Sequence, residues 1–407
     1  MGPDPGGVLE PTAGHGAKAH SSRRCTANRT LRLDAWICRG NLWTPLALGR
    51  WGGADVATRL SCSLHDVALR LETSNADFIN VAQDYLGSLV TEPVPQAIDV
   101  QLLWDRDLPS DPELERVGRR VWLGDERLRL SEIRLMPGLQ MDVIWREHQL
   151  RIQAAYRWPD RRTRWLAKLS ESLRMRTYLS LVYYLVYFPW GWWLDRVRGW
   201  VLLHAAGLMH AQDGLIVAGL PGCGKSTFVW AALSRSGWRV LSDNLLFING
   251  EQIWACPEPL HVDKHARQLG GAAADHVQAT GRTFSHQREE FSIAPSRRAH
   301  SARASHVLFL RRGQHHVVRP MQSAAAFRRL WANDSLAQEW RAYRISIAAL
   351  QHLVPEIGDP ERRWASLSGL SRLPCYEVVA EENRALPPSF YQMLEANEIA
   401  AEEVQVV

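Results

Sequence analysis

Lysine is scarce in this chain, although basic residues are plentiful. Among 48 lysines and arginines in 407 residues there are only four lysines, which are Lys18, Lys168, Lys225 and Lys264. The net charge is +5, but the arginines are scattered in short pairs and form no basic stripe interleaved with aromatic side chains. Such a stripe is the usual electrostatic footprint of nucleic-acid binding. We therefore expect no nucleic-acid partner.

Paired cysteines are also missing. The six cysteines are widely spaced, with no Cys-x-x-Cys and no paired Cys/His spacing of the kind that binds zinc. This pattern predicts neither a structural zinc site nor a disulfide framework. The histidines His261, His265 and His276 lack a regular ligand spacing as well, so we expect no metal site among them.

The chain also lacks a long uninterrupted apolar run. The most apolar stretch, residues 178–194, is 17 residues long and is interrupted by Pro189 and Gly191. A bilayer span needs about 20 apolar residues, so we interpret the stretch as a buried helix. Residues 163–188 predict one or two helices that end before Pro189. The first residues contain no uninterrupted apolar segment typical of a signal peptide. The sequence thus predicts a cytoplasmic protein with no membrane partner.

Changes in composition divide the chain into three parts. Residues 1–30 are rich in Gly, Pro, Ala and Ser, and we expect them to form a disordered tail. Residues 31–195 predict a mixed α+β lobe, in which we identify no residues that carry chemistry. Residues 196–407 predict an α/β domain, because short apolar strands alternate there with helices.

Individual elements follow from periodicity and turn signals. In the lobe, Asn75 is expected to cap a helix, and 98–104 predicts a strand. Alternating apolar residues over 139–156 predict a hairpin that turns near Glu147 and His148. The elements expected in the second domain are strands 200–211, 215–218 and 238–241, a hairpin 245–255 around Asn249-Gly250, irregular loops over a site at 264–300, a buried strand 304–312, helices 322–331 and 335–353, a strand 375–379 and a helix 387–398.

One short segment carries a strong functional signal. Residues 219–226, GLPGCGKS, match the phosphate-binding P-loop pattern at every fixed position, between an apolar strand and a predicted helix. Glycines in this loop let backbone N–H groups approach phosphate oxygens, and the helix that follows adds its positive N-terminal dipole. The residues expected to contact the nucleotide are Gly219, Leu220, Pro221, Gly222, Cys223, Gly224, Lys225, Ser226 and Thr227.

The loop side chains receive separate roles. Lys225 is expected to reach the β- and γ-phosphates, Ser226 to ligate Mg²⁺, and Thr227 to lie near the α-phosphate. Cys223 is interpreted as a small filler that faces the loop. The sequence therefore predicts ATP and Mg²⁺ as cofactors.

An acid follows on the next predicted strand. The segment WRVLSD ends its apolar run at Ser242, and Asp243 follows it. We expect this strand to lie next to the loop strand, so that Asp243 stands at the edge of the sheet where α/β proteins bind ligands. The strand 304–312 ends in Arg311 and Arg312 and supplies no acid. Asp243 is therefore the candidate Mg²⁺ ligand and general base, and the alternative is an Asp that merely starts a turn.

Residues 202–248 resemble the P-loop kinase domain of the HPr kinase/phosphorylase family. In that family a His-bearing strand, a short hairpin, the P-loop, a helix and an acidic pair follow in the order found here. The resemblance implies active-site positions for His204, Lys225, Ser226 and Asp243, with His204, Lys225 and Asp243 as catalytic residues. It also implies the fold shared with phosphoenolpyruvate carboxykinases, which we expect for the domain at 196–407. A weaker similarity, in element order only, extends to about residue 397.

Two departures narrow the expected activity. Asn244 stands where the family has its second acid, and the downstream signature for phosphorylase action and HPr docking is not found. We therefore expect transfer of the γ-phosphoryl group of ATP to a hydroxyl, a Ser of a protein or peptide, and not phosphorolysis. The alternatives are a kinase of small-molecule hydroxyls and a non-catalytic ATP-binding regulatory or scaffold protein. The sequence is also compatible with a homo-oligomer.

A polar stretch further along the chain offers one more candidate group. GRTFSHQREEF, residues 281–291, contains Arg282, His286 and Arg288. One of the two arginines is a candidate clamp for the γ-phosphate or the substrate, because a guanidinium binds phosphate with two parallel hydrogen bonds. The alternative is a solvated run of charges.

Overall fold

The fold comes from a computed structural model of the chain. It describes residues 58–92, 97–131, 133, 136–270, 276–283, 288–333, 352–354, 360–381, 384–396, 398 and 404–405. The tail expected at 1–30, His286 and most of the helix expected at 335–353 lie outside the described residues. The described part is a mixed α/β structure with three sheets, and it belongs to one compact unit, Asp55–Val407.

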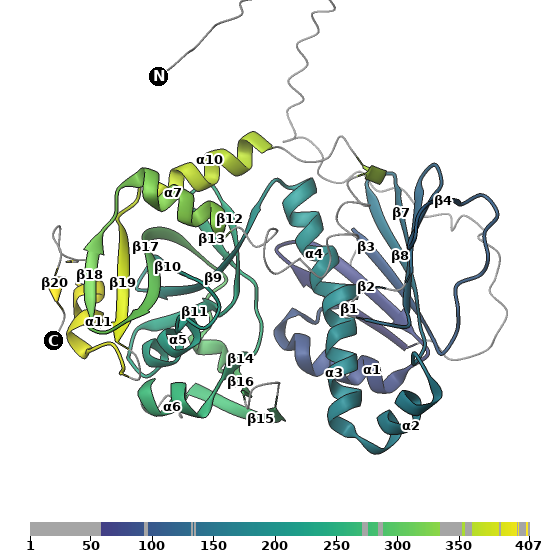
Figure 1. Cartoon of the computed structure of the whole chain (residues 1–407), viewed down its shortest axis with the longest axis horizontal. Coiled ribbons are helices and arrows are strands. Elements are labelled where there is room, and N and C mark those ends of the chain that lie inside the picture. Colours follow the sequence, from purple (N-terminus) through teal and green to yellow (C-terminus); the bar gives the residue numbers. More distant parts are fainter. Residues whose placement is uncertain are drawn as a thin grey trace, which may run out of the picture. The chain divides into compact units, whose positions relative to one another are not determined.

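The first sheet has eight strands (Figure 1). The strands are β1 (Thr58–Leu64), β2 (Val67–Thr73), β3 (Ile98–Trp104), β4 (Glu115–Gly118), β5 (Val121–Leu123), β6 (Arg127–Leu130), β7 (Leu139–Arg146) and β8 (Gln149–Tyr156), in the order β1-β2-β3-β8-β7-β6-β5-β4. The predicted hairpin is confirmed by the antiparallel pair β7–β8. Glu147 and His148 both have positive φ, 51° and 59°, which is typical of a two-residue hairpin turn.

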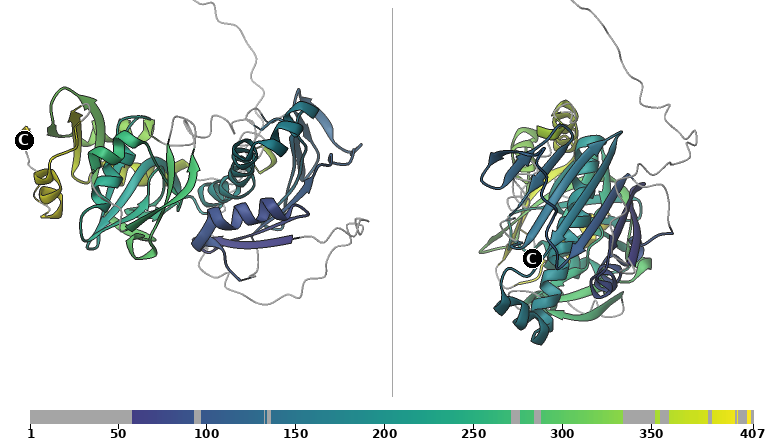
Figure 2. Two further views of the ribbon diagram at one scale, coloured as in Figure 1. Left: turned by 90° about the horizontal axis from the view of Figure 1, so that it is seen from below. Right: turned by 90° about the vertical axis from the view of Figure 1, so that its right-hand side faces the viewer.

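Helices α1 and α3 pack together on the first sheet (Figures 1 and 2). The helical elements of this part are α1 (Ala76–Leu86), η2 (Gly87–Leu89), α2 (Arg161–Leu169), α3 (Glu171–Val182), η3 (Tyr183–Tyr187), α4 (Phe188–Trp192) and η4 (Trp193–Val197). The predicted cap is confirmed, because Asn75 Oδ1 accepts a 3.0 Å hydrogen bond from the Phe78 N–H. Phe78 and Ala82 are buried in the same core as Leu69.

The apolar stretch 178–194 is a buried helix, but the prediction that it ends before Pro189 is wrong. The helix continues through Pro189 into α4, and a π-helical turn, η3, precedes the proline. A π-turn shifts the backbone hydrogen bonds from i→i+4 to i→i+5, which relieves the clash that a proline ring causes in a regular α-helix. No helix in the described part of the chain is long and apolar enough to cross a membrane.

The second sheet holds the predicted P-loop strand. Its strands are β9 (Val201–His210), β10 (Asp213–Ala218), β11 (Trp238–Ser242), β12 (Leu245–Asn249), β13 (Gln252–Ala255), β17 (Ser301–Gly313), β18 (Val317–Pro320), β19 (Cys375–Glu381) and β20 (Val404–Gln405). The order is β10-β9-β12-β13-β17-β19-β18-β20, β11 pairs with β9, and β10 also pairs with β17. The hairpin predicted at Asn249-Gly250 is confirmed by the pair β12–β13, with Gly250 at φ 62°.

A third, three-stranded sheet corrects the expectation of loops at 264–300. It has the order β14-β16-β15, with β14 (Leu260–Val262), β15 (Val277–Thr283) and β16 (Glu289–Ile293), and the same stretch contains α6 (Lys264–Gly270) and η7 (Pro295–Arg297). Leu260, Phe291 and Ile293 are buried against Trp230 in the core of the second domain. The sequence does not indicate this sheet, because polar residues occupy most positions of its strands apart from the three buried residues.

The second sheet is covered by helices on both faces. These are α5 (Lys225–Leu233), α7 (Ser323–Ala332), α10 (Pro360–Ser371) and α11 (Pro388–Glu395). Phe228 of α5 and Phe390 of α11 belong to one buried cluster, and Leu330 of α7 and Leu367 of α10 belong to another. The helices expected near α7 and α11 are confirmed, whereas α10 was not predicted from the sequence.

Candidate nucleotide-binding site

Strand β9 lies between the P-loop strand and the strand before Asp243. We expected β10 and β11 to be neighbours, but each pairs with β9 instead. Strands β11 and β12 share the other edge of β9, where β11 ends at Ser242 opposite Gly207 and β12 begins with Leu245 opposite His204. Asp243 and Asn244 therefore lie at the junction over the middle of β9.

The same part of β9 also positions the P-loop. Ala218, the last residue of β10, is opposite Ala205, one residue after His204. The loop that begins at Gly219 therefore starts beside His204 and near Asp243. The register of β9 therefore brings His204, Gly219 and Asp243 to the same region.

The loop glycines adopt a backbone conformation that other residues rarely adopt. Gly219, Gly222 and Gly224 have φ of 151°, 82° and 109°. A Cβ on Gly219 would lie 2.6 Å from the Cys223 Sγ, whereas a Cβ on Gly222 or Gly224 would meet no atom within 4 Å. Gly219 is therefore needed for close packing inside the loop, and the other two glycines leave open space for a ligand.

Lys225 is buried at the start of α5 and bonds to its own loop. Its Nζ donates to the carbonyl oxygens of Gly219 at 2.8 Å and Leu220 at 3.4 Å, and lies 3.0 Å from Nε2 of His204. An ammonium group has only donors, so Nε2 of His204 is the acceptor in this contact. Loop and strand together hold the only lysine of the P-loop at its mouth.

Ser226 and Asp243 are joined by a hydrogen bond. The Ser226 hydroxyl donates to Oδ2 of Asp243 at 2.9 Å. The other carboxylate oxygen, Oδ1, is buried and has no hydrogen-bond partner among the described residues. Burial raises the pKa of Asp243, while the Ser226 hydroxyl and the charges of His261, Lys225 and Arg288 lower it by less.

The turn after β11 is formed by Ser242 and not by Asp243. The Ser242 hydroxyl donates to the Cys256 carbonyl oxygen at 2.9 Å and accepts from the backbone N–H of Leu245 at 3.3 Å. The carboxylate of Asp243 is therefore not required for the turn. Its hydrogen bond to Ser226 favours the interpretation as a site residue over the alternative of a turn residue.

The oxygen atoms around Ser226 fit a magnesium ion. Mg²⁺ prefers hard oxygen ligands, and in sites that handle phosphate it is bound by one or two carboxylates and the phosphates themselves. The buried, unpartnered Oδ1 of Asp243 and the adjacent Ser226 hydroxyl match that donor set. Among the described residues, no three His, Cys, Asp or Glu side chains form a group that could hold a metal without further ligands.

The candidate arginines differ in their surroundings. The positive charge of Arg288 is the smallest of the influences that lower the pKa of the Asp243 carboxyl. Arg282 instead forms an ion pair with Glu290, with 3.0 Å between Nη1 and Oε1, and lies 3.9 Å from the carboxylate of Asp84.

Arg312 is a contact of the P-loop that the sequence does not indicate. Its Nε donates to the carbonyl oxygen of Gly222 at 3.0 Å, although we had interpreted this stretch only as the end of a strand. The parallel pairing of β17 with β10 brings the end of β17 to the P-loop. No local sequence pattern predicts this pairing, because it joins strands about 90 residues apart.

A hollow lies on the α5 side of the loop. Thr227 and Phe228 of α5 form one wall, and Leu386 and Tyr391 from the C-terminal part of the chain form another. The apolar side of Phe228 faces Tyr391, with ring centroids 5.3 Å apart. Both rings are buried, and the hollow has a volume of only about 30 Å³.

Comparison with known proteins adds no further assignment. No protein-family model matches the chain, and a search of curated proteins finds no match.

Proposed function

We propose that the protein is an ATP- and Mg²⁺-dependent kinase that transfers the γ-phosphoryl group to a Ser hydroxyl of a protein or peptide. The observation that carries the proposal is the 2.9 Å hydrogen bond between Ser226 and Asp243 at the mouth of the P-loop. It places a carboxylate with one unpartnered oxygen where a nucleotide held by the loop would present its phosphates.

We assign the second domain to the P-loop kinase fold of the HPr kinase and phosphoenolpyruvate carboxykinase type. The order of elements supports this assignment: the His-bearing strand β9, the short connection to β10, the P-loop, α5 and the acid after β11. The parallel pairing of β10 with β17 is consistent with a nucleotide-binding α/β sheet.

The loop residues bind and orient the nucleotide. Backbone N–H groups around Gly222 and Gly224 receive phosphate oxygens, and the N-terminal dipole of α5 stabilises their charge. Lys225 exchanges the carbonyl oxygens of Gly219 and Leu220 for oxygens of the β- and γ-phosphates.

Asp243 handles the proton of the acceptor. The hydroxyl oxygen forms a bond to the γ-phosphorus, the bond from that phosphorus to the bridging oxygen breaks, and ADP leaves with the electron pair. The proton of the hydroxyl passes to the Asp243 carboxylate, which must be ionised to accept it. His204 holds Lys225 through Nε2 and is a positioning residue.

Mg²⁺, held by Ser226 and Asp243 together with the phosphates, would neutralise charge on the transferred group. Arg288 and Lys225 supply further positive charge from the protein itself. Electrostatic stabilisation of this kind is the main contribution of proteins to phosphoryl transfer.

A non-catalytic ATP-binding regulatory protein is the second candidate. Asn244 favours it, because an amide cannot supply the second carboxylate of the family pattern. ATP hydrolysis separates the two functions without knowledge of the acceptor, since water replaces the hydroxyl. A kinase hydrolyses ATP slowly, and Asp243→Asn should lose this activity. A protein that only binds ATP should show the same background rate of ATP hydrolysis in the wild type and in Asp243→Asn.

A further inference from the structure

Arg312 lies at the end of β17, directly beside the P-loop. The parallel pair of β10 and β17 places Phe309 opposite Ala218, the last residue before the loop. The next residue of β17 packs closely on the loop itself, because a Cβ on Gly219 would lie 2.7 Å from the carbonyl oxygen of Leu310. A neighbouring strand of the sheet therefore holds Arg312 at the loop.

The guanidinium group of Arg312 is only partly used by the protein. Its Nε donates to the carbonyl oxygen of Gly222 at 3.0 Å. A guanidinium carries five N–H donors in one plane, and those on the two Nη groups of Arg312 have no hydrogen-bond or ion-pair partner among the described residues. The side chain is exposed. The loop thus anchors one edge of the guanidinium and leaves the other edge for a ligand.

Arg312 borders the same hollow as Gly224 and Thr227. The hollow has a volume of about 30 Å³, which is room for two or three oxygen atoms at about 10–15 Å³ per water-sized group. A Cβ on Gly224 would meet no atom within 4 Å, so the loop backbone is open at this point. The space beside Arg312 therefore suits the oxygens of a phosphate group.

The P-loop has a cation on each side. Strand β10, which leads into the loop, lies between β9 and β17. On the β9 side, His204 lies 3.0 Å from the ammonium group of Lys225, which is expected to reach the β- and γ-phosphates. On the β17 side, Arg312 lies beside Thr227, which the loop pattern predicts near the α-phosphate. A triphosphate that extends from Lys225 toward Thr227 brings its α-phosphate to Arg312.

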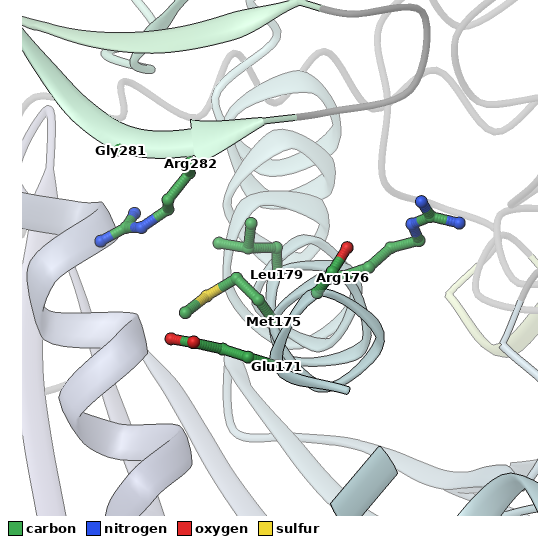
Figure 3. A pocket seen from close by; sticks show the side chains of 7 residues that line it. Glu171, Met175, Arg176, Leu179, Gly281 and Arg282 are labelled. Atoms are coloured by element: carbon green, nitrogen blue, oxygen red, sulfur yellow. The ribbon is translucent and has the colours of Figure 1, made fainter. Parts of the chain in front are cut away.

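The cleft between α3 and β15 does not bring its arginines together in this way (Figure 3). It has a volume of about 290 Å³ and is lined by both Arg176 and Arg282. Arg282 forms an ion pair with Glu290, with 3.0 Å between Nη1 and Oε1. Figure 3 shows the guanidinium groups of the two arginines pointing in opposite directions. Their charges therefore do not converge on one anion.

We propose that Arg312 binds the α-phosphate of the nucleotide through its Nη groups while its Nε holds the carbonyl oxygen of Gly222. The proposal rests on the proposed ATP-dependent function and adds a second protein cation to the same site. An arginine suits this double task because its donors form a rigid planar fork. A lysine has a single nitrogen and cannot hold the loop and the phosphate in the same geometry.

The contribution of Arg312 is measured by isothermal calorimetry of the full chain with ATP and Mg²⁺. Arg312→Ala should weaken ATP binding about tenfold, as expected for the loss of a charge-assisted hydrogen bond, and Arg312→Lys should recover only part of the affinity. The matched control is Arg303→Ala, which removes an exposed arginine from the far end of the same strand, where it pairs with Glu251 at 2.8 Å. This control should bind ATP as the wild type does. Circular dichroism shows whether each variant is folded.

ATP analogues separate a phosphate contact from a change in the shape of the loop. The two diastereomers of ATPαS each replace one non-bridging α-oxygen by sulfur, which is a weaker hydrogen-bond acceptor. We expect one diastereomer to bind the wild type several-fold more weakly than the other, and this preference should be lost in Arg312→Ala. ATPγS is the control analogue, because its sulfur lies on the γ-phosphate. Its affinity relative to ATP should be the same in both proteins.

The outcomes distinguish this contact from the proposed function. Unchanged ATP affinity in Arg312→Ala overturns the α-phosphate contact, and if Lys225→Ala still weakens ATP binding, the nucleotide site itself stands. A loss of affinity in Arg312→Ala that leaves the preference between the ATPαS diastereomers intact also overturns the contact, since Arg312 would then only position the loop. A wild type that binds no ATP contradicts the contact and the proposed function together. A preference that depends on Arg312, in a protein that transfers no phosphate, supports the contact and contradicts the kinase.

Discussion

The ammonium group of Lys225 lies 3.0 Å from Nε2 of His204, on the strand that also positions Asp243. This contact uses Nε2 of His204 as the acceptor and ties the P-loop lysine to the central strand β9. The resemblance at the level of sequence suggested a site role for His204, whereas the geometry assigns it the narrower task of positioning Lys225.

Lys225→Ala should weaken ATP binding about tenfold or more. The lysine is the only side-chain cation within the loop, and a hydrogen bond to a charged group contributes roughly 1.5–3 kcal/mol. Isothermal calorimetry with ATP and Mg²⁺ measures the effect, and circular dichroism shows whether the variant is folded. An unchanged affinity in a folded variant would remove the P-loop assignment.

His204→Gln should be milder than His204→Ala. Glutamine retains an acceptor for the Lys225 ammonium, whereas alanine leaves a buried donor without one, at a cost of about 1–3 kcal/mol. We expect a few-fold loss of ATP affinity for the alanine variant and near-recovery for glutamine. Equal losses in both would indicate that the imidazole itself takes part in the reaction.

The stability of the apo protein should show the raised pKa of Asp243. Because the folded-state pKa is higher than in the unfolded chain, ionisation of Asp243 disfavours the folded state, and stability is lost as the pH rises through the folded pKa. Thermal melts of the wild type and Asp243→Asn should therefore converge at low pH and diverge above this range. Parallel melting curves at every pH would show that the carboxyl is not perturbed.

The local features of the fold were predictable because each has a short-range cause. The cap at Asn75, the hairpin at Glu147-His148 and the one at Asn249-Gly250 depend on a few adjacent residues. The P-loop belongs to the same class, since its function requires fixed glycines and a lysine at fixed spacing. Such signals survive in a single sequence.

Features that depend on distant parts of the chain were not predictable. The insertion of β9 between β10 and β11 is a choice of sheet order, which no local pattern determines. The third sheet is hidden because Glu290 and His261 occupy buried or half-buried positions that usually hold apolar residues. The contact of Arg312 with the loop likewise requires the parallel pair of β10 and β17.

Deletion of residues 2–28 should change neither the melting temperature nor ATP affinity. Their composition is too poor in large apolar residues to form a packed core. Differential scanning calorimetry of the truncated and full-length proteins is the measurement. A fall of several degrees would show that this segment packs on the rest of the protein.

The most direct test of the proposed kinase is single-turnover transfer from labelled ATP to a Ser-containing peptide or protein, with wild type and Asp243→Asn compared. We predict that the wild type transfers phosphate. Asp243→Asn should bind ATP within a few-fold of the wild type but transfer phosphate ~10²–10⁴ times more slowly, the usual range for loss of a general base. Equal rates in the two proteins would contradict the role of Asp243. If the wild type binds ATP tightly but neither transfers phosphate to any acceptor nor hydrolyses ATP, the proposed kinase function is contradicted.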